Sequence, residues 1–355
     1  MGDKGKKKVF GNLNTEIVSQ ILEQSFQDIK IESFRVKEFH AGTNLSLLLE
    51  LEYDKGIGPH SVFVKVSDKL SSRLALRSLG ALYTESLLAK EKTSLPFRHP
   101  HLYGGMCNRR KFYAVLAEED ISGFGKCHTP LETLNLEEVK SGLDELAKLH
   151  ASQWGLRQEE SFLRPWKLKE PFATVSIFNL MRAFKKLENT GHALTITKHL
   201  RPLTLSREFQ ESSLLYREGV QTLLHGDPHI GNTYTVAQSD LGFLDLQLMR
   251  YGNWSFDVGY FLLSSLSSQS RQDNLEELVR YYLDRLTILS IEAPNFQKAF
   301  CLIRYTPAFG LVSWLHTLAF RVFQKEEYCL EMISRFFSAY EDLDTNELFT
   351  QRISK

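Results

Sequence analysis

The chain has 355 residues, of which 43% are apolar and 24% charged, a balance typical of a folded globular protein. This length fits one large domain or two moderate ones. Lys plus Arg and Asp plus Glu number 43 each, so the formal net charge is zero. A protein that binds nucleic acid along one face is usually basic, and we therefore expect no nucleic-acid partner.

The four cysteines stand far apart without a Cys-x-x-Cys pair, which argues against a zinc ribbon and a dense disulfide scaffold. No apolar run approaches the roughly 20 residues that a membrane-spanning helix needs. The N-terminal residues are basic and lack the apolar segment of a signal peptide. We therefore expect a cytoplasmic protein without a membrane partner, and the sequence does not indicate an oligomeric state.

The first third of the chain alternates between helical and extended patterns. Apolar residues at helical spacing or in alternation predict two helices and four strands. In chain order these elements are a helix at 14–26, strands at 34–39, 44–53 and 61–66, a helix at 74–89 and a strand at 111–117. This order favours a small antiparallel sheet with a helix packed on it.

The remainder of the chain is mainly helical in pattern. Asn135 followed by Glu138 resembles a capping box and predicts the start of a helix that reaches His150. Further helical patterns cover 178–186, 207–220 and the chain from residue 274 onward, and short apolar strands are expected at 222–224 and 241–246. We predict an α+β chain with two lobes, residues 1–118 and 119–355.

Four groups of polar residues stand in an order that suits phosphoryl transfer. Lys65 ends a strand and Glu85 lies in the next helix, while Asp227 and Asn232 share a loop and Asp245 lies in an apolar strand. A Lys held by a Glu neutralises the phosphates of ATP, and Mg²⁺ prefers carboxylate and amide oxygens. A loop Asp can orient a hydroxyl and take up its proton.

These residues resemble a known family. The segment His225-Gly-Asp-Pro-His-Ile-Gly-Asn is similar to the catalytic loop of the aminoglycoside-phosphotransferase-like and choline-kinase-like small-molecule kinases. Gly242-Phe-Leu-Asp-Leu-Gln resembles their metal-binding segment. The Asp-Leu-Gln form and the segment 252–263 resemble most closely the ecdysteroid-kinase-like subgroup and its bacterial relatives. The resemblance implies a two-lobed, protein-kinase-like fold with a nucleotide-binding N-terminal lobe and a catalytic, substrate-binding C-terminal lobe.

The resemblance implies a role for each matched residue. Asp227 is implied to be the catalytic aspartate, and Asn232 and Asp245 are implied to bind Mg²⁺. Lys65 is implied to hold the phosphates of ATP, with Glu85 orienting it.

Other matched positions are implied to line or support the site. Gly42 and Thr43 lie in the turn that covers the nucleotide, and Glu118 and Glu119 fall where the family binds adenine. Asp257 is implied to brace the catalytic loop. His225 is expected to be a structural histidine bonded to the backbone, and His150, although it too matches a family position, to be a packed helix histidine.

Several alternatives remain open from the sequence. Glu91 rivals Glu85 as the partner of Lys65. His225, Asp227 and His229 also form a pattern that suits Zn²⁺, although no further His or Cys stands nearby to complete the site. Aromatic residues crowd the C-terminal third, where they fit core packing, an apolar acceptor pocket or a cage for a quaternary amine. These aromatic residues are Trp254, Phe256, Tyr260, Trp314, Phe320, Phe323, Phe336, Phe337 and Tyr340.

We predict an ATP- and Mg²⁺-dependent kinase that phosphorylates a hydroxyl group of a small molecule. The alternative is a nucleotide-binding pseudokinase that acts as an interaction module. A protein kinase is disfavoured because no Ala-Pro-Glu segment follows Asp245, and no P-loop or nucleophile-elbow motif is present. The sequence does not name the acceptor, and the subgroup implies a bulky apolar or steroid-like alcohol.

Overall fold

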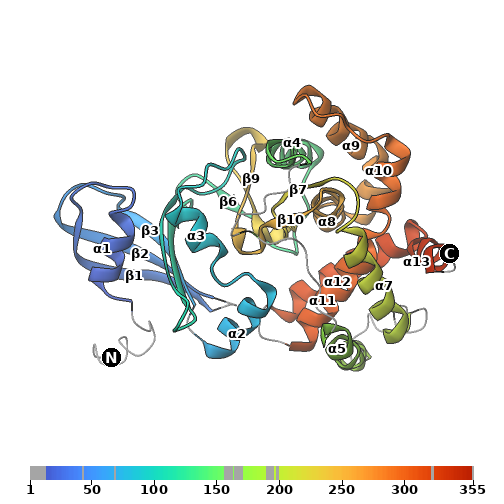
Figure 1. Cartoon of the computed structure of the whole chain (residues 1–355), viewed down its shortest axis with the longest axis horizontal. Helices are drawn as coiled ribbons and strands as arrows, with labels where there is room; N and C mark the ends of the chain where they lie inside the picture. The colour runs from blue at the N-terminus through green and yellow to red at the C-terminus, as the bar shows by residue number, and fades with distance from the viewer. Residues whose placement is uncertain are drawn as a thin grey trace. The chain divides into compact units, whose positions relative to one another are not determined.

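The computed structural model describes residues 13–41, 44–67, 69–155, 163, 171–188, 196, 200–320 and 324–353. The chain divides into two compact units (Figure 1). Unit 1 comprises the described residues up to Leu95 together with His99–Phe124 and Asp245–Leu248. Unit 2 comprises Pro96–Arg98, Gly125–Leu244 and the described residues from Met249 onward.

Unit 1 is built on an antiparallel sheet of five strands in the order β1-β2-β3-β5-β4. These strands are β1 Lys30–Ala41, β2 Leu45–Lys55, β3 Ser61–Val66, β4 Leu102–Asn108 and β5 Tyr113–Glu119. The predicted strand at 61–66 is confirmed to the residue, because its residues alternate between a buried face of valines and a half-buried face. Val62, Val64 and Val66 point into the apolar core that they share with β2, β5 and the helix at Thr15–Leu22.

Three helices accompany this sheet: α1 Thr15–Leu22, α2 Leu70–Leu79 and α3 Thr84–Lys90. The prediction of one continuous helix over 74–89 was wrong. Gly80 ends α2 in the left-handed conformation with φ of 77°, and α3 begins four residues later. Glycine adopts this conformation at no steric cost, and it commonly stops a helix.

Strand β4 was missed by the sequence analysis, because its two adjacent glycines weaken the strand pattern. The structure shows what these glycines allow. A Cβ atom at Gly104 would lie 2.1 Å from the Ile21 carbonyl oxygen of α1, and one at Gly105 would lie 2.2 Å from the Ser86 carbonyl oxygen of α3. Because neighbouring residues of a strand point to opposite faces, the two helices approach opposite faces of β4 closely.

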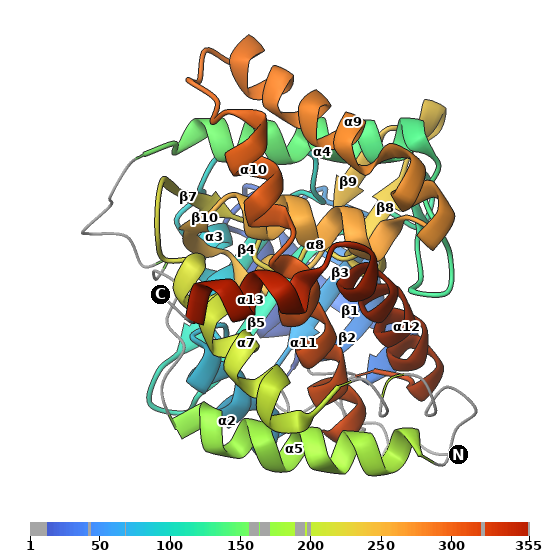
Figure 2. The ribbon, with the colours of Figure 1, turned by 90° about the vertical axis from the view of Figure 1, so that its right-hand side faces the viewer.

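Unit 2 is mainly helical (Figure 2). Its helices are α4 Leu136–Ser152, α5 Pro171–Leu187, α7 Pro202–Leu215, α8 Ser255–Ser265, α9 Ser268–Ile288, α10 Phe296–Ile303, α11 Thr306–Phe320, α12 Glu326–Asp342 and α13 Thr345–Ile353. Its short strands are β6 Lys126–Cys127, β7 Gln221–Leu224, β8 Thr233–Thr235, β9 Leu241–Phe243 and β10 Arg250–Asn253. Strands β6, β8 and β9 form one sheet, and β7 pairs with β10. The expected α+β class, with a small antiparallel sheet and a mainly helical C-terminal part, is confirmed.

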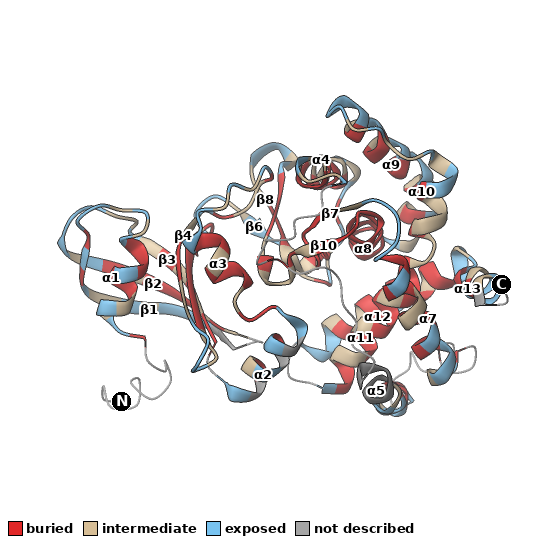
Figure 3. Ribbon diagram, in the orientation of Figure 1, coloured by how far each residue is buried: buried red, intermediate tan, exposed pale blue. Residues whose placement is uncertain are grey.

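Helix α8 forms the centre of unit 2. All its residues are buried, in agreement with its apolar character around the whole circumference, and Figure 3 shows the helix entirely in the colour of buried residues. The predicted capping box at the start of α4 is confirmed, because the Asn135 side chain accepts from the Glu138 N–H and the Glu138 side chain accepts in return. No helix in the described ranges has both the length and the apolar character to cross a bilayer.

Two predicted elements of unit 2 end earlier than expected. The helix predicted to reach Val220 stops at Leu215, and Gly219 then turns the chain with φ of 68°. The strand predicted over 241–246 stops at Phe243, and Asp245 adopts a φ of 59°, which no strand residue has. A positive φ is unfavourable for a residue with a side chain, and such positions cluster at functional sites.

Candidate active site

The first group of candidate residues lies in unit 1, around Lys65. Residues of β3 alternate between the two faces of the sheet, so Lys65 lies on the face opposite the valine core. Its side chain is only 12% exposed. Burying an ammonium group costs free energy unless carboxylates compensate its charge, so partners are required here.

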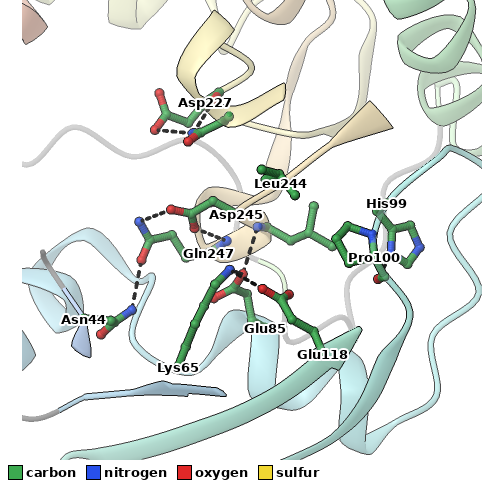
Figure 4. Close-up of polar contacts among 12 residues, drawn as sticks. Asn44, Lys65, Glu85, His99, Pro100, Glu118, Asp227, Leu244, Asp245 and Gln247 are labelled. Atoms are coloured by element: carbon green, nitrogen blue, oxygen red, sulfur yellow. Dashed lines mark hydrogen bonds and ion pairs between the residues drawn. The ribbon is translucent and has the colours of Figure 1, made fainter. Parts of the chain in front are cut away.

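Helix α3 supplies the first of these partners. The Lys65 Nζ lies 2.7 Å from the Glu85 Oε1, whose side chain is 7% exposed (Figure 4). The same carboxylate oxygen also accepts from the backbone N–H of Leu246 at 3.0 Å. Glu91, the rival candidate, is exposed at the C-terminal end of α3. The structure therefore pairs Lys65 with Glu85.

Strand β5 supplies a second partner, which was not foreseen from the sequence. The Glu118 Oε1 lies 3.2 Å from the Lys65 Nζ, and its side chain is 7% exposed. Lys65 pairs across the sheet with Leu116, so Glu118, two residues further on, projects from the same face. A close cross-strand neighbour of this kind is found only once the register of the sheet is known.

The charges of this cluster change the proton affinity of its members. Burial alone would lower the pKa of Lys65, but attraction by Glu118, Glu85 and Asp245 outweighs burial and raises that pKa. Burial raises the pKa of both Glu85 and Glu118. The charge of Lys65 opposes this rise but does not cancel it, because one ammonium group faces three carboxyl groups. The cluster therefore favours a bound proton or a further cation.

Asp245 is held by the residue two positions after it. The Gln247 side-chain amide donates to the Asp245 Oδ2 at 3.2 Å, and the Asn44 side-chain amide lies 3.4 Å from the Gln247 Oε1. Figure 4 shows these three side chains in a row. Gln247 thus links Asp245 to Asn44, the last residue of the predicted nucleotide-covering turn. Gly42 and Thr43 of that turn lie outside the described residues.

Glu119, the last candidate in unit 1, ends β5. Its side chain accepts from the backbone N–H of His101 at 3.1 Å, and its own N–H donates to the His101 carbonyl oxygen. Glu119 is half-buried. Its assignment to the adenine site stays a prediction.

The second group of candidate residues lies in unit 2, in the loop that follows β7. Gly226 has φ of 84°, which turns the chain directly before Asp227. The Asn232 side-chain amide donates to the Asp227 carbonyl oxygen at 2.9 Å and approaches the Asp227 Oδ2 at 3.3 Å. The two predicted residues are therefore in direct contact, which closes the loop on itself.

Asp257, in the first turn of α8, binds the backbone at the start of this loop. Its carboxylate accepts from the backbone N–H groups of His225 at 2.6 Å and Gly226 at 3.0 Å. His150 of α4 is wholly buried and lies between the Asp257 carboxylate at 3.2 Å and the Tyr282 hydroxyl at 2.7 Å. Sequence analysis treated His150 as a packing residue. The structure adds that it orients Asp257, and its match to a family position was the available signal.

The two loop histidines interact with the backbone. The His225 Nε2 lies 2.9 Å from the Leu244 carbonyl oxygen, and its Nδ1 lies 3.3 Å from the Asp227 N–H. The His229 Nδ1 accepts from the Gly231 N–H, and burial lowers the pKa of His229 to about 3. Within the described ranges no group of three or more His, Cys, Asp or Glu residues is placed to hold a metal ion, so a zinc site receives no support.

Arg250 is a further residue that the sequence analysis missed. It lies in β10 opposite Leu224 of β7, and burial lowers its pKa to about 10, while the carboxylates of Asp227 and Asp257 oppose that change. A guanidinium group remains charged under these conditions. Arg250 therefore compensates the negative charge of the loop residue Asp227 and of Asp257 in α8.

Comparison with known families decides the relationship. The ecdysteroid kinase-like family matches residues 79–291, which include Glu85, Asp227 and Asp245. The chain belongs to the ecdysteroid kinase-like family. The resemblance inferred from the catalytic-loop and metal-segment motifs is thereby confirmed. No curated protein shows significant sequence similarity to the chain.

Solved structures with the same fold extend over almost the whole chain of this ecdysteroid kinase-like protein. A spectinomycin phosphotransferase, solved with ADP and spectinomycin, is 14% identical, with a TM-score of 0.53, and the match covers 95% of this chain and 99% of that chain. A choline kinase from Cryptosporidium parvum is also 14% identical, with a TM-score of 0.52 and coverage of 94% and 98%. At this identity the comparison shows the fold, which is that of the kinase-like phosphotransferases.

Proposed function

We propose that the protein is an ATP- and Mg²⁺-dependent phosphotransferase whose acceptor is a hydroxyl group of a small molecule. The observation that carries this proposal is the buried Lys65–Glu85 pair, whose carboxylate oxygen also accepts from the N–H directly after Asp245. A structural ion pair needs no such connection. A phosphate-binding lysine beside a metal-binding aspartate does, because both act on the same triphosphate.

The residues of unit 1 fit a divalent cation and a nucleotide. Mg²⁺ takes hard oxygen ligands, and Asp245 offers a carboxylate within a cluster that holds more carboxyl groups than ammonium groups. An ion bound at Asp245 would supply charge neutralisation for the phosphates, and the amide oxygen of Asn232 stays the predicted second ligand. Lys65 would bind the phosphate oxygens, and Glu85 would hold its ammonium group in place. The ADP bound to the spectinomycin phosphotransferase supports a nucleotide in this fold.

The residues of unit 2 would act on the acceptor. Asp227 would accept a hydrogen bond from the acceptor hydroxyl and take up its proton while the oxygen attacks the γ-phosphorus atom and the bond to the β-phosphate breaks. The Asp257 carboxylate, with two loop N–H groups bound, would keep Asp227 in position. No covalent intermediate on the protein is needed, because positioning and charge compensation suffice for this reaction.

We propose a bulky apolar alcohol, of the steroid type that the family name suggests, as the acceptor. Two aromatic side chains flank His229, two residues after Asp227. The ring of Trp314 lies 5.2 Å from the His229 imidazole and that of Tyr260 lies 6.4 Å from it, both edge-on. His229 is uncharged, since burial lowers its pKa to about 3. We take these apolar aromatic side chains beside the catalytic loop as support for an apolar acceptor.

The decisive experiment measures ATP consumption with Mg²⁺ over a library of sterols, other apolar alcohols, amino sugars and choline analogues. Asp227→Asn is the matched control, because it keeps the shape of the side chain and removes its basicity. We expect turnover to fall about 10²–10⁴-fold in this variant while nucleotide affinity stays nearly unchanged. Equal turnover in a folded Asp227→Asn variant would contradict the catalytic role. Nucleotide binding without turnover of any acceptor would instead identify a pseudokinase that serves as an interaction module.

A further inference from the structure

The ammonium group of Lys65 has two carboxylate partners from different elements. Glu85 of α3 lies at 2.7 Å and Glu118 of β5 at 3.2 Å, and all three side chains are almost completely buried. A lysine that only needs to be oriented towards a phosphate requires one carboxylate. One Lys–Glu pair is neutral, whereas the triple of Lys65, Glu85 and Glu118 carries a net negative charge when all three groups are ionised.

This arrangement has a consequence for any phosphate that approaches Lys65. Each ammonium group has three N–H donors, and two of them face the carboxylates of Glu85 and Glu118. A triphosphate brings several negative charges to a group whose positive charge is already overcompensated. Repulsion between like charges at a separation of a few ångströms is substantial in a buried site, where water screens it poorly.

We propose that Glu118 is a positioning residue that competes with the nucleotide phosphates for Lys65 and thereby sets the affinity of the site for nucleotide. This inference rests on the proposed function. It differs from the expected adenine contact of Glu118, because it acts on the phosphate end of the nucleotide through Lys65. Glu85 remains the partner that keeps Lys65 in place, since its oxygen is fixed by a second donor, the N–H of Leu246.

The test is the affinity for ADP and ATP, each with and without Mg²⁺, measured by calorimetry. Glu118→Gln keeps the size of the side chain and removes its charge, and Glu118→Met removes its hydrogen-bonding atoms as well. We expect both variants to bind Mg²⁺-free nucleotide about tenfold more tightly than the wild type. Glu52→Gln removes the same charge from an exposed position of β2 and should leave the affinity unchanged.

A second arm tests whether Glu118 acts through Lys65. In a Lys65→Met background Glu118 loses its ammonium partner, and a buried carboxyl group without a cation stays protonated and neutral. Adding Glu118→Gln to Lys65→Met should therefore change the nucleotide affinity by less than about twofold. A merely structural role of Glu118 would change unfolding temperatures but not produce this dependence on Lys65.

The outcomes separate this inference from the proposed function. Unchanged or weaker nucleotide affinity in Glu118→Gln and Glu118→Met, with wild-type protein that binds nucleotide, would overturn the inference and leave the kinase assignment intact. The full gain in affinity persisting without Lys65 would overturn it as well. Wild-type protein that binds neither ADP nor ATP would overturn both the inference and the proposed function.

Discussion

Lys65 illustrates how a single residue gains a role from its surroundings. Its position in β3 places it on the half-buried face, and two carboxylates from β5 and α3 then compensate its charge. Burial opposes the ionised form, and the carboxylates restore it. The residue thus stays cationic in a site from which water is largely excluded, where a charge interacts more strongly with phosphate than at the surface.

The first prediction concerns Lys65 and Glu85 as a pair. Lys65→Met removes the cation, and Glu85→Gln removes the group that holds it, so the two losses in kcat/KM for ATP should not add. We expect a coupling of about 1–3 kcal/mol in the double-mutant cycle. Lys65→Arg should not restore activity, because a planar guanidinium group does not replace a compact ammonium group. Glu91→Gln is the control and should behave as the wild type. Additive losses would break the pairing.

The second prediction concerns Asp245. Of the two proposed Mg²⁺ ligands, Asp245 is the charged one and Asn232 is an uncharged amide. The Gln247 side chain holds the Asp245 carboxylate in its orientation. In Asp245→Ala we expect the affinity for ATP with Mg²⁺ to fall to that of ATP alone, while the affinity for Mg²⁺-free ATP does not decrease. Calorimetry in the presence of Mg²⁺ and of a chelator measures both values. If Mg²⁺ still strengthened ATP binding in this variant, the ion would be held elsewhere.

At the scale of elements, the close packing of α3 against β4 determines whether Glu85 reaches Lys65. Gly105 makes this packing possible, since a Cβ atom there would lie 2.2 Å from the Ser86 carbonyl oxygen. Ser86 directly follows Glu85 in α3. A backbone atom cannot rotate away as a side chain can, so α3 would have to move if Gly105 carried a side chain.

The third prediction follows from this packing. Gly105→Ala should lower the free energy of unfolding by about 1–3 kcal/mol and raise KM for ATP, because α3 and Glu85 are displaced together. Gly123→Ala is the matched control within unit 1, since a Cβ atom at Gly123 meets no atom within 4 Å. Urea unfolding and steady-state kinetics measure the two effects. Equal stability of both variants would mean that α3 shifts without cost.

At the scale of the whole molecule, each of the two units is built from several separate stretches of the chain. Asp245–Leu248 belong to unit 1, although the residues on either side belong to unit 2. The backbone N–H of Leu246 is fixed by Glu85, and the Leu244 N–H donates to the Asn232 carbonyl oxygen of unit 2. Each of these bonds lies within one unit, so the chain passes from unit 2 into unit 1 between Leu244 and Asp245.

Unit 2 also contains a buried acid that affects stability. Glu208 of α7 is 2% exposed and accepts from the Tyr340 hydroxyl of α12 at 2.8 and 2.9 Å. Burial raises the pKa of Glu208 to about 7, although the hydrogen bond from Tyr340 opposes this rise. Since the folded value lies above the unfolded value of 4.5, the stabilisation from Glu208 is complete below pH 4.5 and is lost as the pH rises through about 7.

The fourth prediction uses this pH dependence. Between pH 5 and pH 8, the contribution of Glu208 should lower the free energy of unfolding of the wild type by about 2–3 kcal/mol. Glu208→Gln keeps an acceptor for the Tyr340 hydroxyl and cannot ionise, so this part of the pH dependence should disappear. Urea unfolding of both proteins at the two pH values gives the difference. The same pH dependence in both proteins would show that Glu208 is ionised in the folded state.

Local chemistry made much of the fold and of the candidate site predictable from the sequence. The alternation at 61–66 depends only on neighbouring residues, as does the capping box of Asn135 and Glu138, and both were found. The loop from His225 to Asn232 carries its turn and its polar groups within eight residues, so its composition suffices to identify it. Strand β4 was missed because the packing of α1 and α3 stabilises a segment whose own strand propensity is weak.

The choice of partners was decided only by the tertiary structure. Sequence spacing left Glu85 and Glu91 open as partners of Lys65, and the approach of α3 to β4 selected Glu85. Glu118 joined Lys65 through the register of β3 and β5, and His150 joined Asp257 across 107 residues. Charged and polar groups gain their energies from distance and burial, which depend on the packing of segments that are remote in the sequence. The sequence therefore determined which chemical groups are present, and packing determined which of them interact.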